Sequence, residues 1–271
     1  MMSLFPKDFA FSFLTIAGSD NSGGAGLQAD IKTATVLGGY AASAVTAITV
    51  QDRFGVKKCQ HVDAALVSEQ ILSVLTDRQI DVIKIGMLGC ADIVKKVANI
   101  LEDYPDITVI LDPVLAASDG AALLDEDAID ILKKRLMPRA YVITPNLPEL
   151  RILSGIKISS VKTALAAGQK LLEDGAQNLL LKGGHACITE EVTDILLTPE
   201  GSHKFSLPYL ETQAGHGTGC TLASALGCYL AKGHALIDAV RMAKEYVYKT
   251  LQNAPVSGKG TDPLCHNFIM L

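Results

Sequence analysis

Residues 213–226 decide the fold, and they read Gln213-Ala214-Gly215-His216-Gly217-Thr218-Gly219-Cys220-Thr221-Leu222-Ala223-Ser224-Ala225-Leu226. Three glycines alternate with other residues and then give way to an Ala/Leu-rich run that reaches Lys232, a pattern typical of a tight loop that opens a helix. Free backbone N–H groups and the positive end of the helix dipole meet at such a junction, and glycines allow a ligand to approach closely. We therefore expect an anion site here, with a phosphate as its ligand.

Cys220 falls in the first turn of this expected helix. A helix N-terminus lowers the pKa of a thiol, so this side chain is a candidate base or hydrogen-bond partner. The alternative is a small apolar residue that fills the seam between the helix and a sheet. We favour the functional interpretation because the anion loop and the cysteine coincide.

Composition restricts the class of protein. Of the 271 residues, 49% are hydrophobic and 20% are charged, so the chain can bury a sizeable core. The net charge of -5 argues against a dedicated nucleic-acid-binding protein, since no basic stripe is available to neutralise phosphates. The six cysteines form no closely spaced pair, which argues against zinc and against a disulfide framework and favours a reducing cytoplasm.

One segment could be mistaken for a targeting sequence, and no segment fits a membrane helix. No run approaches the roughly 20 apolar residues that a membrane helix requires. The apolar residues 9–17 follow Pro6 and Asp8 and lead straight into a glycine-rich loop, so we expect a buried first strand rather than a signal peptide. No membrane partner is expected.

Hydrophobic periodicity predicts an alternation of strands and helices. Apolar runs predict strands at 13–17, 42–50, 82–87, 108–111, 141–144 and 179–181, with a hairpin of 192–197 and 204–207. Helices are predicted at 27–37, 63–76, 91–102, 126–136, 160–173, 221–232 and 235–251. Repeated βα units with near-continuous apolar strands imply a mostly parallel sheet with helices on both faces. Without an internal repeat or linker, we expect a single domain over 1–271, with 1–10 as an N-terminal extension and 255–263 as a flap or surface coil.

The first predicted strand leads into a second glycine-rich loop, residues 18–26. Its spacing does not match GxGxxG, and the chain has no GK[ST], so neither the dinucleotide fingerprint nor a Walker A loop is present. The loop either cradles a small molecule with its backbone amides or is a strand-to-helix turn with Asp20 or Ser22 as the N-cap.

Polar side chains at other strand ends are candidates for a binding site, because ligands bind at the carboxyl ends of parallel strands. The amide of Gln51 offers both a donor and an acceptor, which suits a heteroaromatic ring that bears an amino group; the alternative is a solvated polar residue. Met87 is either a soft wall for such a ring or a core methionine.

A second group of strand-end residues suits phosphate and Mg²⁺. Asp112 follows a strand, and Asn146 and Glu149 stand three residues apart, so they are candidate oxygen ligands for a hydrated Mg²⁺. Asn146 and Glu149 also fit a helix capping box, and the two interpretations are compatible. Lys182 follows a later strand, where it either neutralises a transferring phosphoryl group or is a surface charge.

In their order along the chain, these motifs resemble the hydroxymethylpyrimidine/phosphomethylpyrimidine kinase family of the ribokinase-like superfamily. The residues that carry the resemblance are 14–20 (LTIAGSD), 22–30 (SGGAGLQAD), 84–88 (KIGML), 111–114 (LDPV), 143–149 (ITPNLPE), 182–185 (KGGH) and 216–221 (HGTGCT). They span nearly the whole chain.

The resemblance implies a ribokinase-like three-layer α/β sandwich and ATP-dependent phosphorylation of 4-amino-5-hydroxymethyl-2-methylpyrimidine and then of its monophosphate, in thiamine biosynthesis. It also implies a homodimer. By this likeness the substrate site consists of Gln51, Gly18, Asp20, Ala25, Thr49 and Met87. The nucleotide phosphates would meet Asn146, Glu149, Lys182, Thr218 and Gly219, and Mg²⁺ would be held, through water, by Asp112 and Glu149. The catalytic group would be Cys220, Gly217, Gly219 and Lys182, with Cys220 where sugar kinases have an aspartate base.

Three positions depart from the family pattern. Gly215 stands where a threonine is frequent, Asn21 stands where proline is common, and 116–120 lack a lysine often seen there. Two other functions stay open: a pyridoxal or pyridoxine kinase of the same superfamily, and a vitamin-precursor binding protein without turnover.

Overall fold

The computed structural model describes residues 9–116, 123–183, 190–256 and 260–270 of the chain. Most of the N-terminal extension, most of 116–120, Gly184 and His185 of the family pattern, and 257–259 of the expected flap lie outside these residues. Within the described part, nine strands form one sheet in the order β3-β2-β1-β4-β5-β6-β7-β8-β9. Their bounds are β1 Ser12–Asp20, β2 Tyr40–Asp52, β3 Gly55–His61, β4 Val82–Ile85, β5 Thr108–Leu111, β6 Val142–Ile143, β7 Leu179–Leu181, β8 Glu191–Thr198 and β9 Gly201–Pro208.

The middle of the sheet is parallel, as predicted. Strands β2, β1, β4, β5, β6 and β7 pair in parallel, whereas β3, β8 and β9 add antiparallel edges. The chain leaves β1 toward β2 on one side and returns to β4 on the other, so the order of the strands reverses at β1. Such a switch point opens a crevice at the carboxyl ends of the strands.

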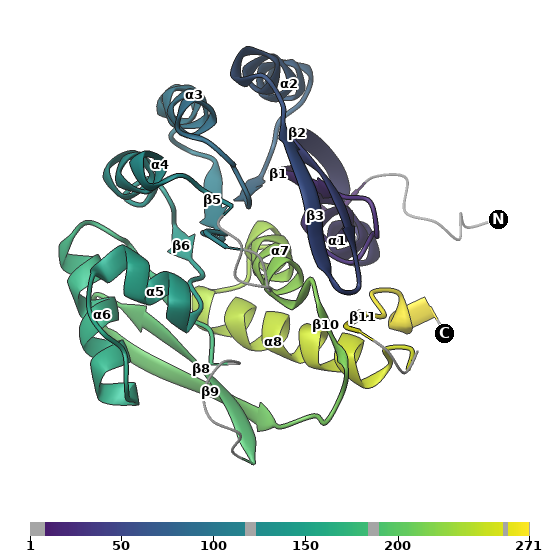
Figure 1. Cartoon of the computed structure of the whole chain (residues 1–271), viewed down its shortest axis with the longest axis vertical. Coiled ribbons are helices and arrows are strands. Elements are labelled where there is room, and N and C mark those ends of the chain that lie inside the picture. Colours follow the sequence, from purple (N-terminus) through teal and green to yellow (C-terminus); the bar gives the residue numbers. More distant parts are fainter. Residues whose placement is uncertain (1–8, 117–122, 184–189, 257–259, 271) are drawn as a thin grey trace.

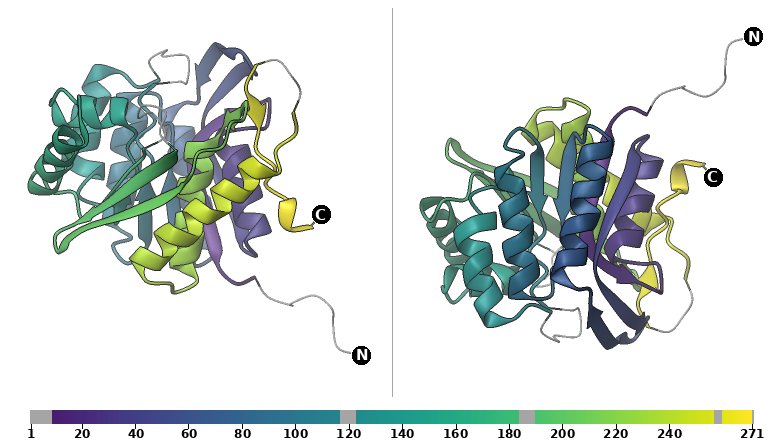
Figure 2. Two further views of the ribbon diagram at one scale, coloured as in Figure 1. Left: turned by 90° about the horizontal axis from the view of Figure 1, so that it is seen from below. Right: turned by 90° about the horizontal axis from the view of Figure 1, so that it is seen from above.

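Helices cover both faces of the sheet, which confirms the ribokinase-like three-layer prediction (Figure 1). Helices α7 and α8 lie over one face, and α2 and α3 lie over the other (Figure 2). Their bounds are α1 Gly26–Val36, α2 Ala64–Asp77, α3 Ala91–Glu102, α4 Glu126–Ile131, α5 Leu147–Ser154, α6 Val161–Glu173, α7 Thr218–Ala231 and α8 Leu236–Gln252. The predicted helix 126–136 is α4 followed by a π-helical turn, Leu132–Leu136.

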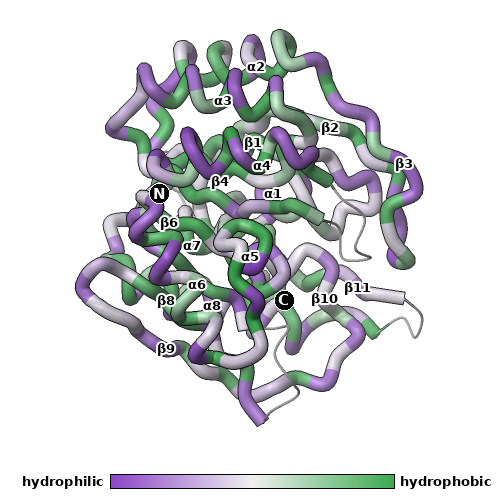
Figure 3. The backbone as a smooth tube through the Cα atoms, turned by 60° about the vertical axis from the view of Figure 1, so that its left-hand side comes forward, coloured by the Kyte–Doolittle hydropathy of each residue, from purple (hydrophilic) through white to green (hydrophobic). Residues whose placement is uncertain are grey.

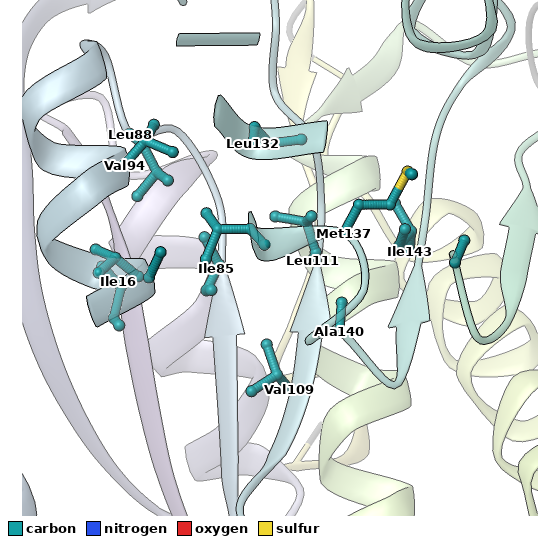
Figure 4. Packing of buried hydrophobic residues seen from close by; sticks show 14 of the residues in the cluster. Ile16, Ile85, Leu88, Val94, Val109, Leu111, Leu132, Met137, Ala140 and Ile143 are labelled. Carbon is teal, nitrogen blue, oxygen red and sulfur yellow. The ribbon is translucent and has the colours of Figure 1, made fainter. Parts of the chain in front are cut away.

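Each face of the sheet has its own hydrophobic core. One core lies under α2–α6, and the other lies under α1, α7 and α8. Ile16, Ile85, Leu111 and Ile143 are register partners on β1, β4, β5 and β6 and all enter the first core (Figure 4). The outer helices alternate between hydrophilic and hydrophobic residues, as expected for helices with one face against a sheet (Figure 3).

Several elements differ from prediction, among them the following three. Strand β1 continues to Asp20 because it stays paired with β2 beyond a bulge at Ala17/Gly18. Strand β3 was not predicted, and it pairs with β2 along an edge. A small second sheet, β10 (Ala214–His216) with β11 (Asp262–Pro263), joins part of the expected flap to the loop before α7.

Among the described residues, no helix is both long enough and apolar enough to cross a membrane.

Candidate active site

The candidate active site lies at the carboxyl ends of the parallel strands. Gly86, Asp112 and Thr144 each follow the end of a strand, and their N–H groups continue the ladder by donating to Ile16, Ile85 and Leu111. Side chains alternate between the two faces of a strand. Because the preceding residues enter the core under α2–α6, the residues of this row point toward the layer that contains α7.

The anion loop, residues 214–220, turns into α7 at Gly217. Gly217 is the N-cap with a φ of 86°, and its carbonyl accepts from the N–H of Thr221 at 2.9 Å. A Cβ atom at Gly217 would lie 1.9 Å from the carbonyl oxygen of Gly24, so only glycine fits this position. The Thr218 hydroxyl donates to the carbonyl of Gly215 at 2.7 Å, which closes the turn and leaves the first N–H groups of α7 without partners inside the helix.

Cys220 lies in the first turn of α7, as predicted, and is partly exposed. Its sulfur accepts a hydrogen bond from the N–H of Gly26, the first residue of α1. The predicted direction of its pKa is wrong. Burial raises the pKa of the Cys220 thiol to about 11, although the ammonium of Lys84 and the Gly26 N–H act in the opposite direction. Loss of water around the sulfur outweighs the helix dipole that the sequence prediction relied on.

Lys182 and Asp112 stand directly beside the start of α7. The Lys182 ammonium donates to Asp112 Oδ1 at 2.8 Å, and the Thr144 hydroxyl donates to the same oxygen at 2.9 Å. A Cβ atom on Gly219 would lie 3.2 Å from Lys182 Nζ and 3.7 Å from Asp112 Oδ2. The Lys182 side chain is only 14% exposed, so it is not a surface charge. Its ammonium and the N–H groups of α7 therefore face one space.

Asn146 and Glu149 form the capping box of α5 that the sequence predicted. The Asn146 side chain accepts from the Glu149 N–H at 2.9 Å, and Glu149 Oε2 accepts from the Asn146 N–H at 2.7 Å. Glu149 Oε2 also lies 3.8 Å from Lys182 Nζ. Burial raises the pKa of Glu149 to about 7; Lys182 lowers it and Asp112 adds to the rise. The cap and a role near phosphates are both compatible with this position.

The carboxylates of Asp112 and Glu149 fit the chemistry of a magnesium site. Asp112 and Glu149 share one ammonium, so their shared surroundings carry an excess of negative charge. Carboxylate oxygens that keep water and phosphate as further ligands are what Mg²⁺ prefers. No group of three or more metal-binding side chains occurs among the described residues, so a metal ion here would take its remaining ligands from phosphate and water.

The buried carboxylate of Asp20 connects the first glycine-rich loop with the anion loop. It is 1% exposed, and its carboxylate accepts the N–H groups of Ser22, Gly24 and Ala25 at 2.7, 3.1 and 2.8 Å. His216 Nε2 is a further partner at 2.7 Å. Burial alone would raise the pKa of Asp20, but these hydrogen bonds hold it well below its ordinary value. These bonds join the first loop to the anion loop, and a contact of Asp20 with substrate stays a prediction.

The alternative in which Asp20 or Ser22 is the N-cap of α1 is wrong. Ala25 is the N-cap, and no side chain caps the helix. Asp20 and Ser22 lie too early in the loop, because β1 extends to Asp20 and the loop folds back over its carboxylate. The first N–H of α1 is instead turned toward Cys220.

Gln51 and its neighbours line the other end of the site. Gln51 Nε2 donates to the Thr49 hydroxyl at 3.0 Å, and this hydroxyl donates to the carbonyl of Ser19 at 3.0 Å. Asn21, the departure from the family pattern, accepts from the Gln51 N–H at 2.7 Å. Met87 is 7% exposed, and its sulfur lies 3.1 Å from where a Cβ on Gly18 would be. The Met87 sulfur therefore packs directly on Gly18, with little room for a side chain at this position.

The two ends of the site meet at β1. A Cβ atom at Gly26 would lie 2.3 Å from the carbonyl oxygen of Gly18, so the start of α1 rests on the end of β1. The same Gly26 holds the sulfur of Cys220. Gly18, a predicted substrate residue, therefore contacts Gly26, and Gly26 in turn lies next to Cys220 of the anion loop.

Two buried ion pairs behind the site were missed by the sequence interpretation. Asp194 accepts from the Gly183 N–H at 2.8 Å and from Lys244 at 2.7 Å, which anchors the residue after Lys182. Lys84 pairs with Asp30 at 2.9 Å. A signal was present for Lys84, because a lysine inside the apolar run 82–85 must be paired if that strand is buried.

Gly183→Ala is expected to lower kcat about 10-fold or more, because its Cβ would lie 1.8 Å from the Thr193 carbonyl oxygen and the backbone beside Lys182 would have to shift. Steady-state kinetics check this. Gly168→Ala is the matched control, since its Cβ would press on Leu197 at 2.3 Å in the core, remote from the site. Equal kcat losses in both variants would show that destabilisation alone is responsible.

Comparisons with known proteins identify the family of this chain. A sequence profile of the phosphomethylpyrimidine kinase family matches residues 20–265. The chain is 43% identical over 97% of its length to "Thiamine biosynthesis bifunctional protein ThiED" of Geobacter sulfurreducens, of which it covers 53%. It is 40% identical to "Hydroxymethylpyrimidine/phosphomethylpyrimidine kinase" of Bacillus subtilis, and the match covers 94% of both chains.

A solved structure extends the likeness to three dimensions. The ADP complex of Bacillus subtilis pyridoxal kinase superposes with a TM-score of 0.88 at 30% identity, over 96% of this chain and 98% of that one. The profile, the curated relatives and the superposition all cover nearly the whole length, and on that basis the chain belongs to the phosphomethylpyrimidine kinase family.

Proposed function

We propose that this chain transfers the γ-phosphoryl group of ATP to the hydroxymethyl group of 4-amino-5-hydroxymethyl-2-methylpyrimidine, and then phosphorylates the resulting monophosphate. The observation that carries the proposal is the position of Lys182 and Asp112 at 3.2 and 3.7 Å from the Cβ site of Gly219, at the start of α7. An anion that enters there meets an ammonium, unpaired N–H groups and the positive end of a helix dipole.

In the proposed mechanism the protein acts mainly by position and charge. The N–H groups of Gly217, Thr218, Gly219 and Cys220 bind the oxygens of the transferring phosphoryl group, and Lys182 neutralises part of its charge. The sulfur of Cys220 accepts the proton of the attacking hydroxyl. The thiolate is the form that accepts this proton, and with a pKa of about 11 it is scarce at neutral pH; phosphoryl transfer, however, depends more on positioning and electrostatic stabilisation than on proton abstraction.

Asp112 and Glu149 would hold Mg²⁺ through water, beside the phosphates that Asn146 and Lys182 approach. When bound, the ion supplies positive charge against the β- and γ-phosphates. The residues of the chain then have to keep Glu149 ionised, and its pKa near 7 makes this the pH-sensitive part of the site.

Gln51 is proposed to bind the aminopyrimidine edge. Its Nε2 already donates to Thr49, which fixes the orientation of the amide and leaves Oε1 to accept from the ring amino group and the second N–H to reach a ring nitrogen. Gly18 and Met87 would lie against the ring, with Ala25 near the reactive group.

Gln51→Leu is expected to raise KM for the pyrimidine about 10- to 100-fold, because one or two hydrogen bonds are worth ~1–3 kcal/mol, while kcat changes less. Initial rates over a range of pyrimidine concentrations provide the measurement. Gln60→Leu on the exposed β3 edge is the matched control. Unchanged KM in Gln51→Leu would remove Gln51 from substrate recognition.

Glu149→Gln is expected to stabilise the unliganded protein above pH 7. The pKa of Glu149 rises from 4.5 to about 7 on folding, so folding favours the protonated carboxyl. This contribution is complete below pH 4.5 and is lost as the pH rises through about 7. Urea unfolding should therefore show a gain of ~1–3 kcal/mol at pH 8 and little change near pH 4. Equal effects at both pH values would contradict the assignment.

A pyridoxal kinase is the second candidate, and the TM-score of 0.88 to such an enzyme favours it. A coupled ADP-release assay with the pyrimidine alcohol, its monophosphate and pyridoxal separates the candidates. We expect turnover with both pyrimidines and much slower turnover with pyridoxal. Faster turnover with pyridoxal would favour the second candidate, and binding without ADP release would favour the vitamin-precursor binding protein.

Three further properties are proposed on the family resemblance and the sequence pattern. The chain forms a homodimer, folds as a single domain over 1–271, and works in a reducing cytoplasm. The five cysteines of the described residues are all free. Sedimentation at micromolar concentration tests the dimer.

A further inference from the structure

Four polar side chains form a closed cluster inside the protein, directly behind the anion loop. Lys84 on β4 is 0% exposed, and its ammonium donates to both oxygens of Asp30 on α1 at 2.9 Å. Thr15 on β1 donates to Asp30 Oδ2 at 2.6 Å, and Ser224 on α7 donates to Asp30 Oδ1 at 2.8 Å. Neither the proposed mechanism nor substrate binding uses these residues.

The cluster lies one helical turn below the catalytic sulfur. Helices α1 and α7 are neighbours in the same layer. Gly26 and Asp30 stand four residues apart on α1, and Cys220 and Ser224 stand four residues apart on α7, so each pair shares one helix face. The Gly26 N–H contacts the Cys220 sulfur in the first turn, and Ser224 contacts Asp30 in the next. The two contacts therefore connect α1 and α7 at two successive helical turns.

Lys84 also has a free path toward the sulfur. Gly86, two residues along β4, has no side chain, and a Cβ there would come within 2.9 Å of Lys84 Nζ. Four charged groups act on the Cys220 sulfur: Lys84, Asp30, Asp112 and Lys182. Of Lys84 and Asp30, the ammonium has the stronger influence on the thiol.

A stability role explains this cluster poorly. Removing a charge pair from water is costly, and apolar replacements of similar volume are frequently as stable or more stable. Two residues earlier on the same strands, apolar side chains enter this layer, Phe13 on β1 and Val82 on β4. A position that could be filled by such residues is instead filled by a pair of charges.

We propose that the Lys84–Asp30 pair, with Ser224, is a positioning device that fixes the first turns of α1 and α7 relative to each other, so that the Cys220 sulfur stays against the Gly26 N–H beneath the anion loop. The proposal rests on the proposed function, because it assigns these residues to the positioning of the proposed base. Lys84 and Asp30 are positioning residues and do not touch the substrate.

The test is the double variant Lys84→Met/Asp30→Asn, which removes both charges, approximately keeps the volume, and leaves a carbonyl oxygen for one of the Thr15 and Ser224 hydroxyls and an amide NH2 for the other. We expect a folded protein with KM values for ATP and the pyrimidine within about 3-fold of wild type, and a kcat at least about 10-fold lower. Ser224→Ala removes only the hydrogen bond between α7 and Asp30. It is expected to lower kcat by a smaller factor than the double variant. Thr33→Val, which removes a buried hydroxyl on α1 that donates to the Ala29 carbonyl and does not contact the cluster, is the control and should leave kcat unchanged.

A second readout does not depend on kinase activity. The rate of Cys220 alkylation by iodoacetamide near pH 8, followed by mass spectrometry of the Cys220 peptide, is expected to fall several-fold in the double variant, because the stronger, positive influence on the thiol is lost. If the wild type shows no turnover but the double variant is alkylated more slowly than the wild type, the proposed function is wrong and the positioning role stands. Wild-type kcat in the folded double variant, or in Ser224→Ala if the double variant does not fold, would overturn the proposal.

Discussion

Cys220→Ala is expected to lower kcat by about 10²- to 10⁴-fold, the range that general acid–base groups usually contribute, while the protein stays folded. The Cys220 side chain lies next to Lys182 and the start of α1. The N–H of Gly26 faces its sulfur. Turnover in the ADP-release assay and thermal unfolding are the two measurements. Cys228→Ala is the matched control, since Cys228 lies on the same helix but is fully buried in the core.

The pH dependence of turnover adds a second check on Cys220. Because burial raises the pKa of this thiol to about 11, the reactive thiolate grows with pH through the alkaline range. We expect kcat of the wild type to keep rising with pH after Glu149 has ionised near pH 7, and the residual rate of Cys220→Ala to lack this later, alkaline rise. A Cys220→Ala variant with unchanged turnover would remove the cysteine from the mechanism.

Lys182→Met is the second change with a large expected effect. It removes the ammonium that faces the first turn of α7, and we expect kcat to fall by about 10²- to 10³-fold with a higher KM for ATP. It also leaves Asp112, which is 2% exposed, without its closest charge partner, so the protein should lose ~3–5 kcal/mol of stability. Stopped assays and urea unfolding measure the two effects.

The double variant Lys182→Met/Asp112→Asn separates these effects. The neutral amide still accepts from Thr144, so most of the lost stability should return. The activity should not return, because the positive charge at the phosphate site is still absent. Recovery of both would mean that Lys182 acts only by stabilising Asp112.

The order of elements was predictable because strand and helix patterns are local. Strands β5 and β7 and helix α3 lie at the predicted residues, since each is a run whose periodicity or apolar character is unbroken. Strand β3 was missed because its sequence, GVKKCQH, is largely polar and it lies at an edge, where only its pairing with β2 makes it a strand. Helix α7 begins at Thr218, three residues before the prediction, because Gly219, which the sequence prediction assigned to the loop, lies in its first turn.

The site was predictable as a set of residue types at strand ends, but not in its electrostatics. Asp112, Glu149 and Lys182 come together because parallel strands end at one edge of the sheet. The raised pKa of Cys220 and the contact between Asp20 and His216 depend on packing between segments that are distant in the sequence, and no local pattern predicts such packing. Lys84 and Asp30 could have been suspected singly, but not that they are partners across 54 residues.

The central claim is that the first turn of α7, with Lys182, stabilises the phosphoryl group as it moves from ATP to an alcohol on a ring held by Gln51. A crystal structure with MgADP, fluoroaluminate and the pyrimidine alcohol tests it most directly. We predict the fluoroaluminate within hydrogen-bond distance of the N–H groups of 217–220 and of Lys182 Nζ, with the alcohol oxygen near the Cys220 sulfur and the ring amino group on Gln51. A fluoroaluminate bound away from α7, or a ring remote from Gln51, would contradict the account.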